Sequence, residues 1–229
     1  MAFWDWLRRK PSNLQIADDT IWLSVTAKCR GICRQVQQET DSNPLVLLVT
    51  HFPDTLAHTK DQLRSEGMEH AGVDRCLSPA ELSGILSRST GPRLFLVPAE
   101  VLAPDDFPGI VSEDSGEVRI VVGERHFLRS ADEEIVRFAG SLNHPCRLAF
   151  HLSLDEPLMR LFVGDWVRNM LSGLGMTESN PISNPMITRR IKAAQAGLAK
   201  QVTDERKAAS AQEWLRLNLP ENAETSSGD

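Results

Sequence analysis

The stretch VVGERHFLRSADEEIVRFAGSLNHPCRLAFHLSL at residues 121–154 carries the clearest information on the fold. It continues an apolar run at 118–122, passes through a helical pattern at 131–140, and ends in a second apolar run at 147–154. Short apolar runs bounded by polar turns are typical of strands buried on both faces of a parallel sheet. This strand–helix–strand unit therefore predicts an α/β protein.

The same alternation extends toward the N-terminus. The runs LVLLVT at 45–50 and RLFLV at 93–97 predict two more buried strands, and residues 69–73 a weaker one. Parallel strands need right-handed helical crossovers, so we expect a mainly parallel sheet with helices on both faces. One helix is expected over 26–40. A second is expected from Asp54 or Thr55 through Glu66, and Gly67 ends it. A third begins at the capping sequence Ser78-Pro79-Ala80-Glu81.

Binding residues in such sheets follow the C-terminal ends of the strands. Here those loops are 51–55, 98–106 and 123–129. One interpretation is a site for an anionic or nucleotide-like ligand, or for acid–base chemistry. The other is a structural ion-pair network around the GERH turn, and the sequence leaves both open. The candidate site residues are Asp106, Glu124, Arg125, His126 and Arg129.

The strand pattern stops after Leu154, and helical patterns follow at 156–162 and 166–174. Beyond two prolines, one long helix is predicted from about Met186 to Leu217. Its first half has apolar residues at three- and four-residue spacing, which predicts a buried stripe. The predicted organisation is an amphipathic arm at 1–16, the α/β domain at 17–176, the long helix at 177–219 and a disordered polar tail at 220–229.

The second half of the predicted long helix has few apolar residues before Trp214. A projecting helix with an exposed terminal tryptophan is a candidate surface for binding another protein. The alternative is that this half folds back on its own domain. The candidate partner-docking residues are Arg189, Arg190, Arg206, Lys207, Trp214 and Leu215.

Composition restricts the classes of function. The net charge of −6 and pI near 5.6 argue against a general nucleic-acid binder. The four cysteines and six histidines have no metal-ligand spacing, so we expect buried thiols and no metal site. We also expect no cofactor.

The chain has no apolar run approaching the roughly 20 residues of a membrane span, and no secretory leader is expected. We expect a cytoplasmic protein. Aromatic and basic residues nevertheless gather in the first ten positions, which is typical of an interfacial anchor at the inner face of the cell membrane. The alternative is an arm that packs on its own domain. The candidate membrane contacts are Trp4, Trp6, Arg8 and Arg9.

Several motifs in order resemble one family. Gly123-Glu124-Arg125-His126 is followed by Asp132 and Ala139-Gly140, then by a SLDEPLMRLF run at 153–162 and by NPMITRRIKAAQ at 184–195. The chain resembles the second nucleotide-binding domain of the SecA preprotein translocase ATPases and the start of their scaffold helix, over residues 17–207. The resemblance implies a RecA-like fold of the P-loop NTPase superfamily and a role in protein export.

The chain departs from that family where ATP is bound. No GxxxxGK[ST] pattern occurs in the sequence. The family's ATP-contacting arginines fall on Val136, Phe138 and Ser141, and Arg137 is one position away. Its glycine-rich loop is replaced by VPAEVLAPDD at 97–106, which keeps an aspartate only at Asp106. The resemblance therefore implies a degenerate domain, and we expect no ATP hydrolysis by this chain alone.

Two functional hypotheses follow. The first is a non-catalytic protein-interaction or regulatory module linked to preprotein translocation, with SecA, the translocon or another membrane-associated protein as partner. The second is an α/β ligand-binding domain or enzyme that uses Glu124, Arg125 and His126. Neither involves nucleic acid.

Overall fold

The computed structural model describes residues 13–41, 44–87, 91, 93–106, 111, 116–162, 173, 175 and 177–219. Within them lies a sheet with the strand order β4-β5-β3-β6-β7-β2-β8, and β1 also pairs with β7. Every pairing is parallel except β2 with β8, which confirms the predicted α/β class. The strands are β1 Leu14–Ile16, β2 Thr20–Trp22, β3 Leu45–Thr50, β4 Ala71–Gly72, β5 Leu94–Pro98, β6 Val118–Val122, β7 Cys146–Ser153 and β8 Ile182–Ser183.

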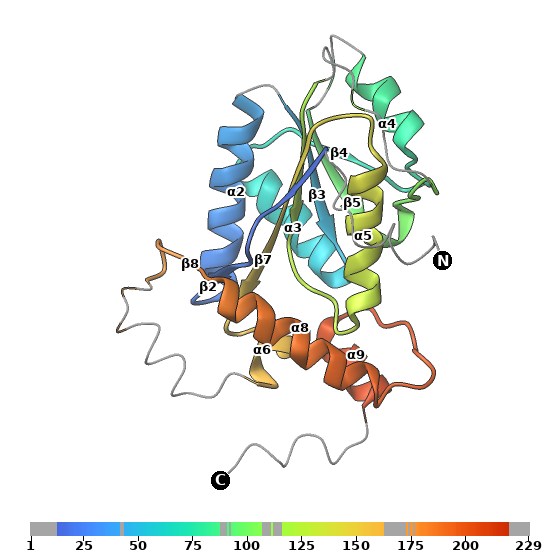
Figure 1. Ribbon diagram of the computed structural model, residues 1–229. Helices are drawn as coiled ribbons and strands as arrows, with labels where there is room; N and C mark the ends of the chain where they lie inside the picture. The colour runs from blue at the N-terminus through green and yellow to red at the C-terminus, as the bar shows by residue number, and fades with distance from the viewer. Residues whose placement is uncertain are drawn as a thin grey trace.

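Helices cover both faces of the sheet (Figure 1). One face packs against α2 (Val25–Asp41) and α3 (Pro53–Ser65), which contribute Ile32, Val36 and Leu63 to its core. The other face packs against α4 (Pro79–Leu86) and α5 (Arg129–Ser141). The remaining helical segments are the 3-10 helix η1 (Ala99–Val101), α6 (Pro157–Arg160), α8 (Pro185–Ala199) and α9 (Ala211–Asn218), and α8 and α9 lie below the lower end of the sheet in Figure 1.

Local signals position several elements as predicted. LVLLVT forms β3 at the predicted residues, and every residue of that strand is buried. Ser78 and Glu81 form a capping box at the start of α4. Gly67 has φ +68 just after α3, a conformation that favours glycine.

The single long helix predicted for 186–217 is wrong. Helix α8 ends at Ala199, residues 201–210 contain no helix, and α9 begins after Ser210. The Ser210 side chain accepts a hydrogen bond from the Glu213 amide at 3.0 Å and so caps α9. The polar residues between the two helices have no apolar stripe to bury, so breaking the helix there lets Trp214 return to the core.

The strands β1, β2 and β8 were not predicted. β1 also places residues 14–16 in the sheet, so this end of the expected N-terminal arm belongs to the domain. In β2, Trp22 lies over Gly31 of α2, where an added Cβ would come within 2.0 Å of the indole ring. The glycine that weakens α2 therefore makes room for this tryptophan.

Some predictions concern residues outside the described ranges. These are Trp4, Trp6, Arg8 and Arg9, the tail at 220–229 and almost all of the helix expected at 166–174. Among the described residues, no helix combines the length and apolar character that a membrane span requires.

Candidate functional site

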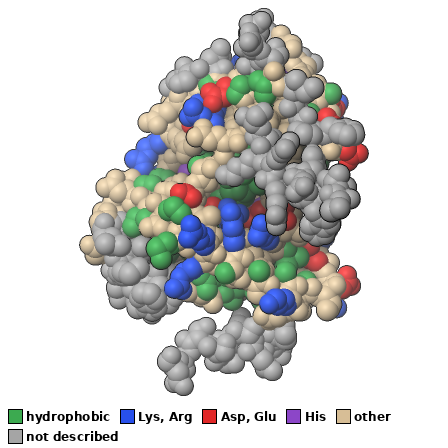
Figure 2. Space-filling model, in the orientation of Figure 1, with side chains coloured by type: hydrophobic (Ala, Val, Ile, Leu, Met, Phe, Trp, Pro, Cys, Tyr) green, Lys and Arg blue, Asp and Glu red, His purple; other side chains and the backbone are tan. Residues whose placement is uncertain are grey.

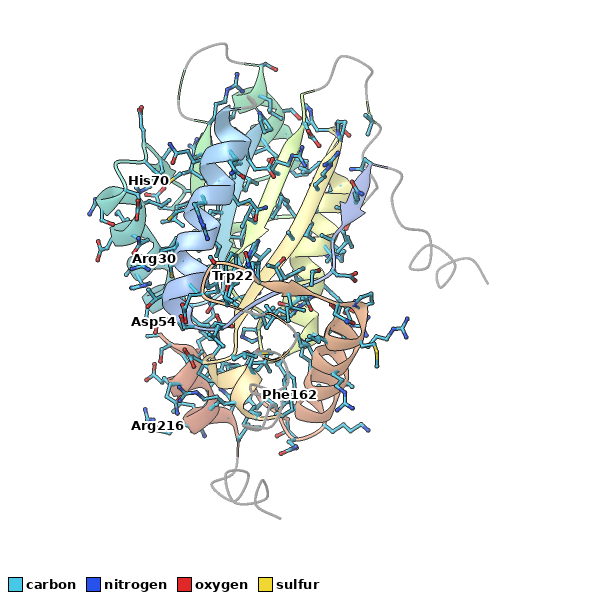
Figure 3. All side chains as sticks on the ribbon, turned by 90° about the vertical axis from the view of Figure 1, so that its left-hand side faces the viewer. Trp22, Arg30, Asp54, His70, Phe162 and Arg216 are labelled. Atoms are coloured by element: carbon cyan, nitrogen blue, oxygen red, sulfur yellow. The ribbon has the colours of Figure 1, made fainter. Side chains whose placement is uncertain are left out.

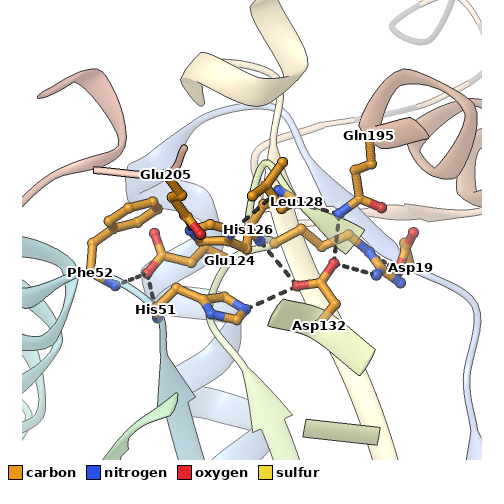
Figure 4. A network of polar contacts seen from close by, with 10 residues as sticks. Asp19, His51, Phe52, Glu124, His126, Leu128, Asp132, Gln195 and Glu205 are labelled. Carbon is orange, nitrogen blue, oxygen red and sulfur yellow. Dashed lines mark hydrogen bonds and ion pairs between the residues drawn. The ribbon is translucent and has the colours of Figure 1, made fainter. Parts of the chain in front are cut away.

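The loops after β3 and β6 lie side by side, because these two strands are neighbours in the sheet. The chain leaves β3 through α3 toward β4 on one side of the sheet, and it leaves β6 through α5 toward β7 on the other side. Ligands of parallel sheets are expected at such a switch point, here between β3 and β6. Glu124, Arg125 and His126 follow β6, and His51 follows β3. Figure 4 shows that His51, Glu124 and His126 belong to one network of polar contacts that also includes Asp132.

Arg125 is the central cation of the network. Its Nη2 lies 2.6 Å from Asp19 Oδ1, its Nη1 lies 2.9 Å from Asp132 Oδ2, and its guanidinium carbon lies 3.8 Å from the centre of the Phe150 ring. Burial alone would lower the pKa of Arg125, but the charges of Asp19 and Asp132 outweigh this and raise it. The arginine is thus held as a buried cation by two carboxylates of its own chain.

Asp132 of α5 accepts hydrogen bonds from the loops after β6 and β3 and from α8. Its carboxylate accepts hydrogen bonds from the His126 amide at 3.0 Å, from His51 Nε2 at 2.9 Å and from Gln195 Nε2 at 2.7 Å. Burial would raise the pKa of Asp132, but the hydrogen bond and charge of His51, with Arg125, lower it overall. The residue therefore stays ionised at neutral pH and ties α5 to β3 and α8.

Two polar side chains of α8 fix this helix on the network. Gln195 Nε2 also donates to the His126 carbonyl at 2.7 Å, and Gln195 is fully buried. Thr188 Oγ1 accepts from the Asp19 amide at 3.1 Å. The orientation of α8 is consequently set by directional contacts as well as by Ile191 and Leu198.

Glu124 fills the position where a parallel sheet offers backbone amides to an anion. Its Oε1 accepts from the amides of His51 at 2.9 Å and Phe52 at 3.0 Å, and its Oε2 accepts from Thr55 Oγ1 at 2.8 Å. These donors lie at the N-terminus of α3, whose unpaired N–H groups and dipole favour negative charge. The chain's own carboxylate therefore occupies this anion site.

His126 is neutral. Burial and the nearby His51 lower its pKa to about 4, although Asp132 opposes this effect. Its Nδ1 accepts from the Leu128 amide at 3.1 Å, so Nε2 carries the proton and faces Glu205 Oε1 at 3.4 Å. The ring packs between Phe52 and Trp214.

Trp214 of α9 packs against the polar network through His126 and Glu205. It is 1% exposed, stacks on Phe127 with ring centres 4.4 Å apart, and donates from Nε1 to Glu205 Oε1 at 2.7 Å. The prediction that Trp214 is exposed at the end of a projecting helix is therefore wrong. The alternative, that this segment folds back on its own domain, is confirmed. Figure 3 shows α9, with Arg216, below the end of α3 that carries Asp54, and the Asp54 amide donates to the Ala209 carbonyl at 3.0 Å.

A second buried pair lies next to the network. Lys28 of α2 donates to the Gly123 carbonyl and to Glu156 Oε1. Burial raises the pKa of Glu156 to about 6, with Lys28 opposing the rise. Burial would lower the pKa of Lys28, but Glu156 and Glu124 raise it. The sequence did not indicate either residue as part of a site.

Beside this pair lies a cavity of about 310 Å³ between α2, α3 and the start of α9. Its wall includes Leu48 of β3 and Gly123, which directly follows β6. Four carboxylates line it against one lysine, Lys28. They are those of Asp54, Glu124, Asp155 and Glu156.

The predicted site residues divide into two sets. Glu124, Arg125 and His126 come together in the network. Arg129 is exposed and pairs with Glu133 at 2.8 Å, and Asp106 is exposed in the loop after η1, outside the network. Sequence reasoning placed His51 in a candidate loop but did not name His51, Asp19 or Gln195 as site residues, although Gln195 belongs to the scaffold-helix motif.

The predicted docking residues differ in exposure, and only the four basic ones are exposed. Arg189, Arg190 and Arg206 are exposed, and Lys207 is exposed with its Nζ 3.0 Å from Glu100 Oε2. Trp214 is buried and Leu215 is half-buried.

The three positions where the SecA resemblance predicts ATP-contacting arginines hold uncharged side chains. Phe138 is buried in the core, Val136 is half-buried, and the Ser141 hydroxyl donates to the Phe138 carbonyl at 2.9 Å. Arg137 is half-exposed and pairs with Glu134 at 3.0 Å. Within the described ranges, no cluster of three or more histidine, cysteine or acidic side chains is suited to a metal ion.

Both the family profile and the sequence relatives of this chain are SecA proteins. A family profile described as the SecA P-loop domain matches residues 110–179. The chain is 26% identical over 228 residues to the protein translocase subunit SecA of Pseudomonas putida (strain W619), covering 86% of this chain and 25% of that protein. It is 38% identical over 102 residues to SecA of Koribacter versatilis (strain Ellin345), covering 44% of this chain and 10% of that protein.

The chain thus spans about a quarter of the length of the first of these relatives. Among solved structures, the C-terminal part of the Fun30 ATPase domain is similar with a TM-score of 0.41 and 9% identity, covering 76% of this chain and 54% of that one. Since the SecA similarity extends over most of the chain, the protein contains a SecA-like domain.

Proposed function

We propose that this chain is a non-catalytic SecA-like module that acts through protein contacts in preprotein translocation. The observation that carries the proposal is that the anion-binding groups at the strand ends are already bound within the chain. Glu124 takes the amides at the start of α3, and Arg125 is held by two aspartates. A phosphate would have to displace these internal partners.

Energetics support the same proposal. Releasing Arg125 toward a ligand would leave Asp19 and Asp132 buried without their counter-charge, and breaking such buried pairs costs about 3–5 kcal/mol. Cations that stabilise the transferred phosphoryl group contribute about 10³–10⁵ in rate. At the three matching positions this chain has Val136, Phe138 and Ser141. ATP turnover by this chain alone is therefore disfavoured.

The partner belongs to the proposal as well. The relatives are named protein translocase subunits, so we infer a partner among translocase components at the cytoplasmic face of the membrane. The domain offers such a partner a rigid body, because α5, α8 and α9 are all fixed to the network described above.

Two measurements test this function. The purified full chain should release no phosphate from ATP above the rate of an Arg125→Met control. After crosslinking in the native cell, the tagged chain should co-purify with translocation components. ATP turnover that the control lacks, or the absence of every translocation component, would contradict the proposal.

The alternative of a ligand-binding domain has one specific observation in its favour, the cavity beside Lys28. Its four carboxylates repel an anion, which argues against a nucleotide there. Inorganic phosphate and ATP should therefore leave the melting temperature unchanged. A rise of several degrees that the cavity-lining changes His58→Ala and Gln212→Ala reduce would favour the ligand instead.

A further inference from the structure

Helix α8 presents an unbalanced positive face. Arg189, Arg190, Lys192 and the C-cap Lys200 are exposed, and Pro185–Ala199 contains no aspartate or glutamate. No ion pair joins any of these four cations to a described residue. Figure 2 shows basic side chains gathered on this part of the surface, where α8 crosses the front of Figure 1.

This face differs from the rest of an acidic protein. The chain has 31 carboxylates and a net charge of −6, so acidic neighbours are common. On α5, Arg129 pairs with Glu133 and Arg137 pairs with Glu134, as expected for an exposed helix. The cations of α8 have no such partners among the described residues, and Arg189 and Arg190 lie in the N-terminal half of the helix, away from the last turn, where the helix dipole would favour cations.

The face is also held in one orientation. Thr188, Ile191, Gln195 and Leu198 are buried on the opposite side, and Thr188 and Gln195 make hydrogen bonds to the core. A partner would therefore meet a preformed surface, with little conformational entropy to lose in α8.

Small residues separate the cations along the helix. Ala193, Ala196 and Gly197 are exposed, and a Cβ added at Gly197 would meet nothing within 4 Å. Glycine inside a helix costs about 1 kcal/mol relative to alanine. No contact with a described residue requires that glycine, but a second backbone could approach closely there.

We propose that this face of α8 binds an acidic helix of a partner protein. Carboxylates of that helix would pair with Arg189, Arg190, Lys192 and Lys200, and its backbone would lie over Ala196 and Gly197. An anionic membrane fits less well, because Met186, at 67% exposure, is the only large apolar side chain that α8 exposes strongly, and interfacial helices insert several. The inference rests on the proposed function and names the class of partner segment.

The test uses the full chain in the native cell. A photo-crosslinking benzoylphenylalanine replaces Ala196 on α8, or Gln62 on α3 as a control position. Crosslinked peptides are then identified by mass spectrometry. We expect Ala196 to crosslink to a protein segment rich in aspartate and glutamate at helical spacing.

A matched pair of charge-reversal variants completes the test. The triple change Arg189→Glu, Arg190→Glu and Lys192→Glu should reduce that crosslink roughly tenfold, through loss of several ion pairs. The triple change Arg30→Glu, Arg34→Glu and Lys60→Glu, at exposed positions on other helices, should leave it unchanged.

Crosslinks from Ala196 to lipid, to a segment without excess acid, to nothing, or with equal sensitivity to both triple variants would each overturn the inference. The proposed function fails separately. If translocation components co-purify while Ala196 gives no acidic crosslink, the function stands and only the docking face is wrong.

Discussion

Arg125 and the arginines of α8 place the same side chain in opposite environments. Arg125 is buried against two aspartates and an aromatic ring, whereas Arg189 and Arg190 are exposed without a described ion-pair partner. The buried cation holds together β6, α5 and the segment before β2. The exposed cations contribute little to the fold, so their charge is available to another molecule.

The largest effect on stability is expected when the buried charge of Arg125 is removed. Arg125→Met should lower the free energy of unfolding by about 3–5 kcal/mol, because Asp19 and Asp132 remain buried without their cation. Arg190→Met should change it by no more than about 0.5 kcal/mol, as for most surface positions. Urea unfolding followed by circular dichroism measures both, and similar losses in the two variants would break the comparison.

The same contrast between buried and exposed positions applies to the large apolar side chains. Trp214→Ala should lower the stability of α9 by about 3 kcal/mol, because the stack on Phe127 and the packing on His126 are lost. Met186→Ala removes a side chain that is 67% exposed and should have almost no effect. Native-state hydrogen exchange of the α9 amides reports the difference. Unchanged protection in Trp214→Ala would mean that the tryptophan does not hold the helix.

Acid should weaken the network in a defined pH window. The pKa of His126 is lowered to about 4 in the folded state from an ordinary value near 6.5, so the unfolded chain takes up the proton first as pH falls. Its contribution to stability is complete above pH 6.5 and is lost between pH 6.5 and about 4, by about 3 kcal/mol. Below that window, protonation of Asp132, whose pKa is also lowered, removes more stability.

Urea unfolding at a series of pH values, for wild type and His126→Gln, measures this effect. The variant should show a flatter profile between pH 6.5 and 4. His58→Gln, changed at an exposed position, should keep the wild-type profile. A wild-type profile in His126→Gln would assign the acid sensitivity to other groups.

The smallest expected effect compares two helical glycines. Gly31→Ala forces a Cβ against Trp22 and should destabilise by about 1–2 kcal/mol after the gain in helix propensity is included. The Cβ of Gly197→Ala meets no atom of the described residues within 4 Å, so this change should stabilise by up to about 1 kcal/mol. Thermal unfolding distinguishes the signs. Destabilisation by Gly197→Ala would show that the chain itself requires this glycine.

Much of the sheet was predictable because its strands have strong local signals. β3, β5, β6 and β7 are apolar runs of five or more residues, and they were predicted within one or two residues. β1, β2 and β8 are two or three residues long, which is too short for a periodic pattern. They form because longer strands or neighbouring strands offer them hydrogen bonds.

The candidate site was predictable only in part. Glu124, Arg125 and His126 are adjacent in the chain, so their grouping was visible. Their roles depend on Asp19, which is 106 positions from Arg125, and on Gln195, which is 63 positions from Asp132. No local pattern pairs residues at such separations.

The sequence by itself determined the α/β class, the main strands and the similarity to SecA, and it has Val136, Phe138 and Ser141 where that resemblance predicts arginines. Each of these depends on residue identity, short-range periodicity or motif order. Only the tertiary structure decided that Arg125 is neutralised internally, that Trp214 is buried, and that the long helix breaks so that α9 returns to the core. Those outcomes depend on the burial of charge and of aromatic surface between distant segments, and that burial exists only after the chain has folded.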